Sequence, residues 1–309
     1  MMEKVIITGA SGFLGGALAK SLLKDGITVV AVGRNLEALE PLRAYGSVIP
    51  VRAELKEYDH LADLLGEAGE RADVFYHFAW DGVFGTAFKD YQRQLNNAKY
   101  ACDALMAAAA LKCKKFVLAG TYNQYEIATR AIGQYDSPRY TCIYASAKTA
   151  ADMMCRTLAN ASGVDYCAGL VCMAYGEGNR SQMLANIVID QLTRGVRPKL
   201  VEAGNPYDMV YIDDIVGAFR AMGERGKNQR TYYVGHRQER TFGELIGAMR
   251  DVLAPGMELV FGEYQETTRL DYSLIDREAL YEDTGFECTA DFGESILRTA
   301  AWLNGWEEK

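Results

Sequence analysis

Short runs of β-branched and other apolar residues alternate with longer helix-period stretches through the first half of the chain. The short runs predict strands at Val5–Thr8, Thr28–Val32, Val48–Val51, Val74–His77, Phe116–Leu118 and Tyr166–Cys172. The stretches between them predict helices at Leu14–Lys24, Leu61–Gly66, Tyr91–Ala110 and Tyr144–Ala161. Strands that alternate with helices in this way are typical of a parallel sheet covered on both faces, so we expect a doubly wound α/β fold.

The pattern loosens after about residue 178. Helices are predicted at Gln182–Leu192, Asp213–Met222, Phe242–Leu253 and Phe292–Leu303, and short strands at Tyr232–Val234 and Leu259–Phe261. No repeat, low-complexity tract or Pro/Ser-rich linker separates the two halves. We therefore expect a dinucleotide-binding Rossmann domain at 1–177, to which parts of 208–240 return, and a smaller, partly interleaved α/β substrate-binding lobe at 178–309.

The composition narrows the class of protein. The 309 residues are 49% hydrophobic and carry a net charge of −8, which argues against nucleic acid or an anionic membrane as the main partner. The seven cysteines are scattered without a CxxC pair, no clustered metal ligands occur, and no window reaches the length of a membrane span. The chain also starts without an apolar signal region. We expect a soluble cytoplasmic protein without a metal.

The stretch "TGASGFLG" places Gly9, Gly12 and Gly15 between the first predicted strand and the first helix. In a dinucleotide-binding turn one glycine makes the tight turn, another lets the backbone approach a pyrophosphate, and the third lets helix and strand pack closely. The helix N-terminus then offers free N–H groups to the phosphates. A plain strand-turn-helix is the alternative, but the second strand about twenty residues on favours a nucleotide.

The end of the second strand bears on the choice of cofactor. An acidic residue there would bind the ribose hydroxyls of NAD, whereas an arginine accommodates the 2′-phosphate of NADP. The sequence offers "AVGRN", with Arg34 and Asn35 and no acid before Glu37. This favours NADP over NAD, the alternative being that Arg34 is a solvated surface charge.

Tyr144 and Lys148 lie four residues apart in "YASAK", so they share one helix face. An ammonium beside a phenol stabilises the phenolate and lowers the pKa of the tyrosine. A tyrosine tuned in this way can exchange a proton with an alcohol or carbonyl oxygen. A half-buried tyrosine beside a snorkelling lysine is the structural alternative.

Taken in order, the motifs resemble the extended short-chain dehydrogenase/reductase family, which includes nucleotide-sugar epimerases, dehydratases and ketoreductases. "TGASGFLG" is similar to its TGxxGxxG, "YASAK" to its YxxxK, and "DVFYHFAW" to its D-x-V-x-H-x-A-A. "VLAGTYNQYE" stands in the place of SSxxVYG, while "AYGEG" and "DMVYIDDIVGAF" are similar to VYGPG and RDFVHVDDVA. The resemblance covers most of the chain.

The resemblance implies that Tyr144 is the general acid/base, that Lys148 lowers its pKa and holds the nicotinamide ribose, and that Thr121 hydrogen-bonds the reacting oxygen. Asn97 would support the active site. The residues expected at the cofactor are Gly9, Ser11, Gly12, Phe13, Leu14, Gly15, Arg34, Asn35, Glu54, Leu55, Phe78, Ala79, Trp80, Asn97 and Lys148. The residues expected at the substrate are Trp80, Asn123, Arg180, Tyr207 and Arg269.

The chain departs from the family pattern at several positions. The Asp-Glu pair of the sugar dehydratases is replaced by Tyr122 and Asn123, which disfavours a 4,6-dehydratase. Tyr207 stands where the family has a phosphate-binding arginine. Arg180, Arg197 or Arg269 would have to replace that arginine, unless each is a surface charge; otherwise Tyr207 stacks on a base or the substrate lacks a nucleotide. The bulky Trp80 replaces a small residue and either walls the sugar pocket or packs against the sheet edge.

Three functions remain open. The first is an NADP-dependent reductase acting on a keto group, expected at C4, of a nucleotide-linked sugar. The second is an NAD(P)-dependent nucleotide-sugar 4-epimerase, which uses the same catalytic residues. The third is a non-catalytic NADP-binding sensor or scaffold, which usually lacks the tyrosine or the lysine. Like many family members, the chain is expected to form a homodimer through Tyr91–Ala110 and Tyr144–Ala161.

Overall fold

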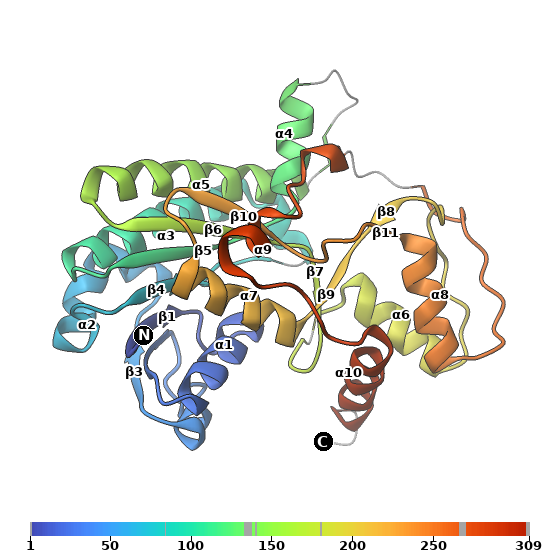
Figure 1. The fold of residues 1–309 in the computed structure, drawn as a ribbon, viewed down its shortest axis with the longest axis horizontal. Helices are drawn as coiled ribbons and strands as arrows, with labels where there is room; N and C mark the ends of the chain where they lie inside the picture. The colour runs from blue at the N-terminus through green and yellow to red at the C-terminus, as the bar shows by residue number, and fades with distance from the viewer. Residues whose placement is uncertain are drawn as a thin grey trace.

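The computed structural model describes residues 2–83, 85–132, 138–139, 141–179, 181–265 and 270–306. In this part of the chain a seven-stranded parallel sheet has the order β10-β6-β5-β4-β1-β2-β3 (Figure 1). Its strands are β1 (Lys4–Thr8), β2 (Thr28–Gly33), β3 (Val48–Arg52), β4 (Val74–His77), β5 (Lys115–Thr121), β6 (Asp165–Val171) and β10 (Arg230–Val234). The structure confirms the predicted Rossmann-type doubly wound fold.

Alternating residues of each strand enter two separate cores, as expected for a sheet covered on both faces. Val5 and Ile7 of β1 pack on one side with α1 and α7, while Ile6 packs on the other with α3 and α5. The helices of the first face are α1 (Phe13–Lys24), α7 (Ile212–Arg225) and α9 (Ala279–Thr284). Those of the second face are α2 (Leu61–Gly69), α3 (Tyr91–Ala110) and α5 (Thr141–Ser162).

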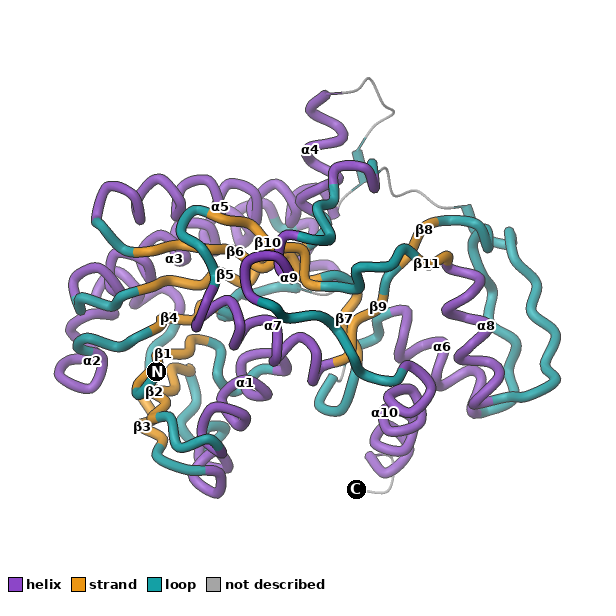
Figure 2. The backbone as a smooth tube through the Cα atoms, viewed as in Figure 1, coloured by secondary structure: helices purple, strands orange, loops and turns teal. Residues whose placement is uncertain are grey.

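A smaller lobe with its own core lies beside the carboxyl ends of the strands, on the right in Figure 2. It contains α6 (Leu184–Thr193), α8 (Phe242–Leu253) and α10 (Phe292–Trp306), a parallel pair of β7 (Met173–Tyr175) with β9 (Met209–Tyr211), and an antiparallel pair of β8 (Pro206–Tyr207) with β11 (Arg240–Thr241). The remaining elements are α4 (Gln124–Ile132) and the 3-10 helices η1 (Glu40–Tyr45), η2 (Leu55–His60), η3 (Gly85–Lys89) and η4 (Tyr272–Leu274).

The predicted strand at Leu259–Phe261 is wrong. The segment runs as a loop in which Phe261 packs edge-on against Phe242, with ring centroids 6.4 Å apart. Just beyond it, the Gly262 N–H donates to the Val201 carbonyl and the Glu263 N–H to the Leu200 carbonyl. The apolar side chains therefore serve the small core without a paired strand beside them, since strand identity depends on a hydrogen-bonded neighbour.

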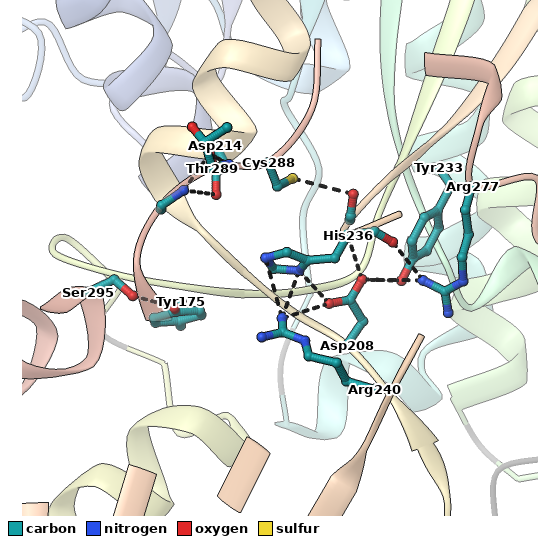
Figure 3. Close-up of polar contacts among 12 residues, drawn as sticks. Tyr175, Asp208, Asp214, Tyr233, His236, Arg240, Arg277, Cys288, Thr289 and Ser295 are labelled. Carbon is teal, nitrogen blue, oxygen red and sulfur yellow. Dashed lines mark hydrogen bonds and ion pairs between the residues drawn. The ribbon is translucent and has the colours of Figure 1, made fainter. Parts of the chain in front are cut away.

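A buried carboxylate joins the sheet to the small lobe (Figure 3). Asp208 lies between β8 and β9 and accepts hydrogen bonds from the His236 N–H and the Tyr233 hydroxyl, both at 2.8 Å. The guanidinium groups of Arg240 and Arg277 approach it to 3.5 and 3.6 Å. Burial acts to raise the pKa of Asp208, but its contacts with His236 and Tyr233 hold that pKa below its ordinary value.

None of the helices in the described residues combines the length and apolarity that crossing a membrane requires.

Candidate active site

A cleft of about 1070 Å³ runs along the carboxyl ends of the parallel strands. It is lined by Gly9 after β1, Arg34 after β2, Glu54 after β3, Ala79 after β4 and Thr121 at the end of β5. Open parallel sheets bind their ligands at this edge, because the loops that follow the strands converge there. The volume and shape suit an extended ligand of dinucleotide size.

The glycine turn forms one wall of the cleft, with Ser11, Phe13 and Leu14 among the lining residues. Gly9 has a φ of +70°, and a Cβ atom on it would lie 2.9 Å from the Ala79 backbone nitrogen. A Cβ atom on Gly15 would lie only 2.5 Å from the Gly9 carbonyl oxygen. Only glycine satisfies both positions, because any larger residue collides with backbone. Helix α1 begins against the cleft at Phe13, with Gly12 as its N-cap and no acidic residue in its first turn.

Positively charged side chains gather where β2 and β3 end. Arg34 and Lys56 line the cleft there, together with Glu54 and Leu55. The hydrogen bond and charge of Lys56 hold the pKa of the Glu54 carboxyl below its usual value. Asn35 is placed differently, because its Oδ1 accepts a hydrogen bond from the Glu37 N–H at 3.0 Å and the residue lies outside the cleft lining.

Tyr144, Lys148 and Thr121 converge in the middle of the cleft. The first two lie one turn apart on α5, and Thr121 ends the neighbouring strand β5. All three are buried, with exposed fractions of 9% for Tyr144, 5% for Lys148 and 7% for Thr121. The structure thus brings together the tyrosine and lysine that the sequence singled out for proton transfer and the threonine that the family resemblance placed beside them.

The pKa of Tyr144 differs from the one expected from the sequence. Burial raises the pKa of Tyr144 above its ordinary value, against the effect of a hydrogen bond with the Thr121 hydroxyl. The prediction that Lys148 lowers this pKa is wrong for the structure, because the ammonium is directed elsewhere. Its Nζ donates to the Ala119 carbonyl at 2.7 Å and lies 3.8 Å from the centre of the Trp80 ring. Burial lowers the pKa of Lys148 itself to about 7.

The loop after β4 is held against α3 by the amide side chain of Asn97. Asn97, which lines the cleft, accepts a hydrogen bond from the Asp81 N–H at 2.9 Å and donates to its carbonyl at 2.7 Å. Phe78, Ala79 and Trp80 of the same segment also line the cleft. Asn97 therefore supports the cleft wall through its bonds to the backbone of the loop.

Only some of the residues predicted to bind the substrate line the cleft. Trp80 and Asn123 line the cleft. Tyr207 does not, because its ring packs edge-on against Phe242 in the small core, with centroids 5.3 Å apart. Arg180 and Arg269 lie outside the described residues. Arg197 is paired with Glu263 at 2.7 Å, away from the cleft lining.

Several lining residues had no signal in the sequence that we recognised. They lie on loops, on short 3-10 helices or on α3, which the tertiary fold brings to the cleft. They include Lys56, Tyr58, Phe88, Arg93, Asn96, Tyr100, Cys172, Asn179, Ser181 and Met183. In the part of the chain that the structure describes, no group of three or more His, Cys, Asp or Glu side chains is arranged to hold a metal ion.

Comparison with known proteins places this fold and cleft in a family. Residues 5–235 match the model of the NAD dependent epimerase/dehydratase family. The chain belongs to this family, within the extended short-chain dehydrogenase/reductases, and is an enzyme of this nicotinamide-dependent kind.

Similar proteins span nearly the whole chain. The dTDP-glucose 4,6-dehydratase of Streptomyces griseus is 23% identical over 314 residues, covering 98% of this chain and 95% of its own. The GDP-6-deoxy-D-mannose reductase of Pseudomonas aeruginosa is 25% identical over 329 residues, covering 100% and 99%. The structure of UDP-glucuronic acid 4-epimerase from Bacillus cereus, in complex with UDP-glucuronic acid and NAD, has a TM-score of 0.76 at 18% identity and covers 98% and 99%. This last similarity is one of fold.

Proposed function

We infer that the enzyme reduces a keto group, at C4, of a nucleotide-linked sugar with NADPH. The observation that carries the inference is the convergence of Tyr144, Lys148 and Thr121 in a cleft whose other wall is the glycine turn. Bound there, the nicotinamide would supply the hydride. The relatives named above act, by their names, on dTDP-, GDP- and UDP-sugars, which supports a nucleotide-linked substrate.

Tyr144 is suited to donate a proton. A tyrosine hydroxyl is protonated at neutral pH, and burial raises the pKa of this one further, so Tyr144 holds a proton that it can give to a partner. In a reduction that partner is the carbonyl oxygen, which gains negative charge as the hydride arrives on its carbon. The Thr121 hydroxyl hydrogen-bonds the same oxygen, and Lys148 adds a positive charge to the pocket.

The cations at the far end of the cleft support NADP. Arg34 and Lys56 both line the region where a 2′-phosphate would lie. NAD is the alternative, since the family is described as NAD dependent and the Bacillus cereus structure contains NAD.

Two other reactions are less well supported. A dehydratase needs an acid/base pair beside the substrate, and Tyr122 and Asn123, which line the cleft after Thr121, do not provide one. A 4-epimerase uses the same three residues and is the main alternative. A non-catalytic NADP-binding sensor, the remaining alternative from the sequence, conflicts with the family of enzymes to which the chain belongs and with the presence of both Tyr144 and Lys148.

The proposal also covers the oligomeric state of the protein and its location in the cell. Helices α3 and α5 carry exposed apolar side chains that suit a homodimer, among them Leu95 and Met153. The described cysteines are free thiols, which fits the reducing cytoplasm.

The test is an absorbance assay at 340 nm with NADPH or NADH and a panel of keto-sugar nucleotides. We expect consumption of NADPH, and a fall of about 10²- to 10⁴-fold in kcat for Tyr144→Phe. Tyr91→Phe, which removes the hydroxyl of an exposed tyrosine, is the matched control. Interconversion of two sugars without net consumption of the cofactor would support the epimerase instead. Full activity of Tyr144→Phe would exclude Tyr144 as the proton donor.

A further inference from the structure

The indole of Trp80 lies against the lysine of the candidate active site. The Lys148 Nζ is 3.8 Å from the centre of the Trp80 ring, well within the range of a cation–π interaction. The same ammonium donates to the Ala119 carbonyl at 2.7 Å. Among the described residues no acidic side chain forms an ion pair with Lys148. A carbonyl dipole and an aromatic face therefore take the place of a counter-ion for this buried charge.

Trp80 is fixed in this position by a buried amide. Its Nε1–H donates to the Gln94 Oε1 at 2.8 Å, and Gln94 is fully buried on α3. The Gln94 Nε2 donates in turn to the carbonyls of Gly82 at 2.8 Å and Ala87 at 3.0 Å. Both ends of the Gln94 amide are thus engaged by one loop, and rotation of the indole away from Lys148 would leave a buried acceptor unsatisfied.

The other groups near Lys148 do not take over this role. The titratable side chains that face it are Tyr144 and Cys155 of its own helix and His77 of β4. The pKa of His77 is lowered to about 3 by burial and by the charge of Lys148, so the ring is neutral at pH 7. Burial raises the pKa values of Tyr144 and, together with its contact to Cys102, of Cys155, so both stay uncharged as well.

We propose that Trp80 is a positioning residue that keeps Lys148 in its ammonium form and directs it into the cleft, a role that rests on the proposed function of Lys148. The ammonium uses one N–H for Ala119 and presents its charge to the indole face, which leaves a further N–H for a hydroxyl of the bound cofactor. Burial has already brought the Lys148 pKa to about 7. Loss of the aromatic face lowers that pKa further, so the ammonium is lost at a lower pH.

The contact is tested first without cofactor or substrate. The chain has three tryptophans, so Trp302→Phe with Trp306→Phe leaves Trp80 as the single indole. Its emission is followed from pH 5 to 9. We expect a change with a midpoint near 7 as the cation beside the ring loses its proton, and no such change after Lys148→Met. Emission that does not titrate, or that titrates equally in Lys148→Met, would overturn the proposal. This result does not depend on any substrate.

The consequence for binding is tested with NADPH and three variants. Trp80→Leu removes the aromatic face, Trp80→Phe keeps a smaller one without the N–H that bonds Gln94, and Tyr91→Leu removes an exposed ring outside the cleft lining. We expect NADPH affinity to weaken with rising pH about one pH unit earlier in Trp80→Leu than in the parent chain. Trp80→Phe should shift this midpoint less than Trp80→Leu, and Tyr91→Leu should keep the parent midpoint. An unshifted Trp80→Leu midpoint would contradict the role, even where the proposed reaction is confirmed.

Discussion

Arg34 is the residue on which the choice between NADPH and NADH depends. It lines the cleft directly after β2, at the end where Lys56 adds a second positive charge. A charge-assisted hydrogen bond is worth about 1.5 to 3 kcal/mol, which corresponds to roughly 10- to 100-fold in affinity. We expect Arg34→Ser to raise the Kd for NADPH by that factor and to leave the Kd for NADH nearly unchanged, as measured by fluorescence titration.

Arg43→Ser is the control for this change, because Arg43 is an exposed arginine that pairs with Glu40 on η1 and does not line the cleft. It should alter neither affinity. An unchanged ratio of the two Kd values in Arg34→Ser would show that Arg34 is a solvated charge and would favour NAD as the cofactor.

Single residues were predictable where their position follows from local geometry. Tyr144 and Lys148 share a helix face by spacing alone, and the three glycines follow from the turn they must make. Tyr207 was misplaced because its orientation depends on Phe242, which is thirty-five positions away in sequence and reaches it only in the folded small lobe. The raised pKa of Tyr144 was likewise out of reach, since it depends on burial in the complete structure.

Helices α3 and α5 lie next to each other over the same face of the sheet (Figure 1) and carry apolar side chains that no part of the described chain covers. Leu95 is 59% exposed on α3, and Met153 is 59% exposed on α5. Burying such side chains between two chains is favourable at about 25 cal/mol per Å² of apolar surface. We therefore expect twice the mass of one chain in solution by light scattering.

Leu95→Glu with Met153→Glu should convert this dimer to the mass of a single chain, because two charges would have to be buried in the interface. Leu297→Glu on α10 is the matched control, since Leu297 is 49% exposed outside this surface. Equal masses for the double variant and the control would place the subunit contact elsewhere or show that the protein is a monomer.

Long periodic helices could be predicted from the sequence more accurately than short elements and loops. Long periodic helices such as Tyr91–Ala110 and Phe242–Leu253 have the bounds predicted for them. The short helix α4, the two-residue strands β8 and β11, and the loop at Leu259–Phe261 did not follow from the pattern. In each of these, tertiary contacts rather than local periodicity decide the backbone conformation.

At the scale of the whole molecule, the two lobes are connected by a buried carboxylate that the sequence analysis did not single out. Asp208 follows Tyr207, and its partners Tyr233, His236 and Arg277 come from the end of β10 and from the C-terminal segment (Figure 3). The contact draws together parts of the chain that fold onto different cores. The contact adds to the pairing of β10 with β6 and to the packing of α7 on the sheet, which bring this part of the chain back to the larger core.

Replacement of this carboxylate should therefore destabilise the protein as a whole. We expect Asp208→Asn to lower the free energy of unfolding at pH 7 by about 3 kcal/mol, because it leaves the partly buried guanidinium groups of Arg240 and Arg277 without their carboxylate. The pKa of Asp208 is depressed in the folded chain, so its contribution is complete above the unfolded pKa of about 3.9 and is lost as the pH falls through the folded value. Urea unfolding at pH 7 and at successively lower pH should show the difference in unfolding free energy between parent and variant narrowing.

Asp213→Asn, which changes an exposed aspartate paired with Arg298, is the control and should lower the unfolding free energy by less than about 1 kcal/mol at any pH. A gap that stays constant down to low pH would mean that Asp208 acts through its shape and hydrogen bonds, and that its charge does not hold the lobes together.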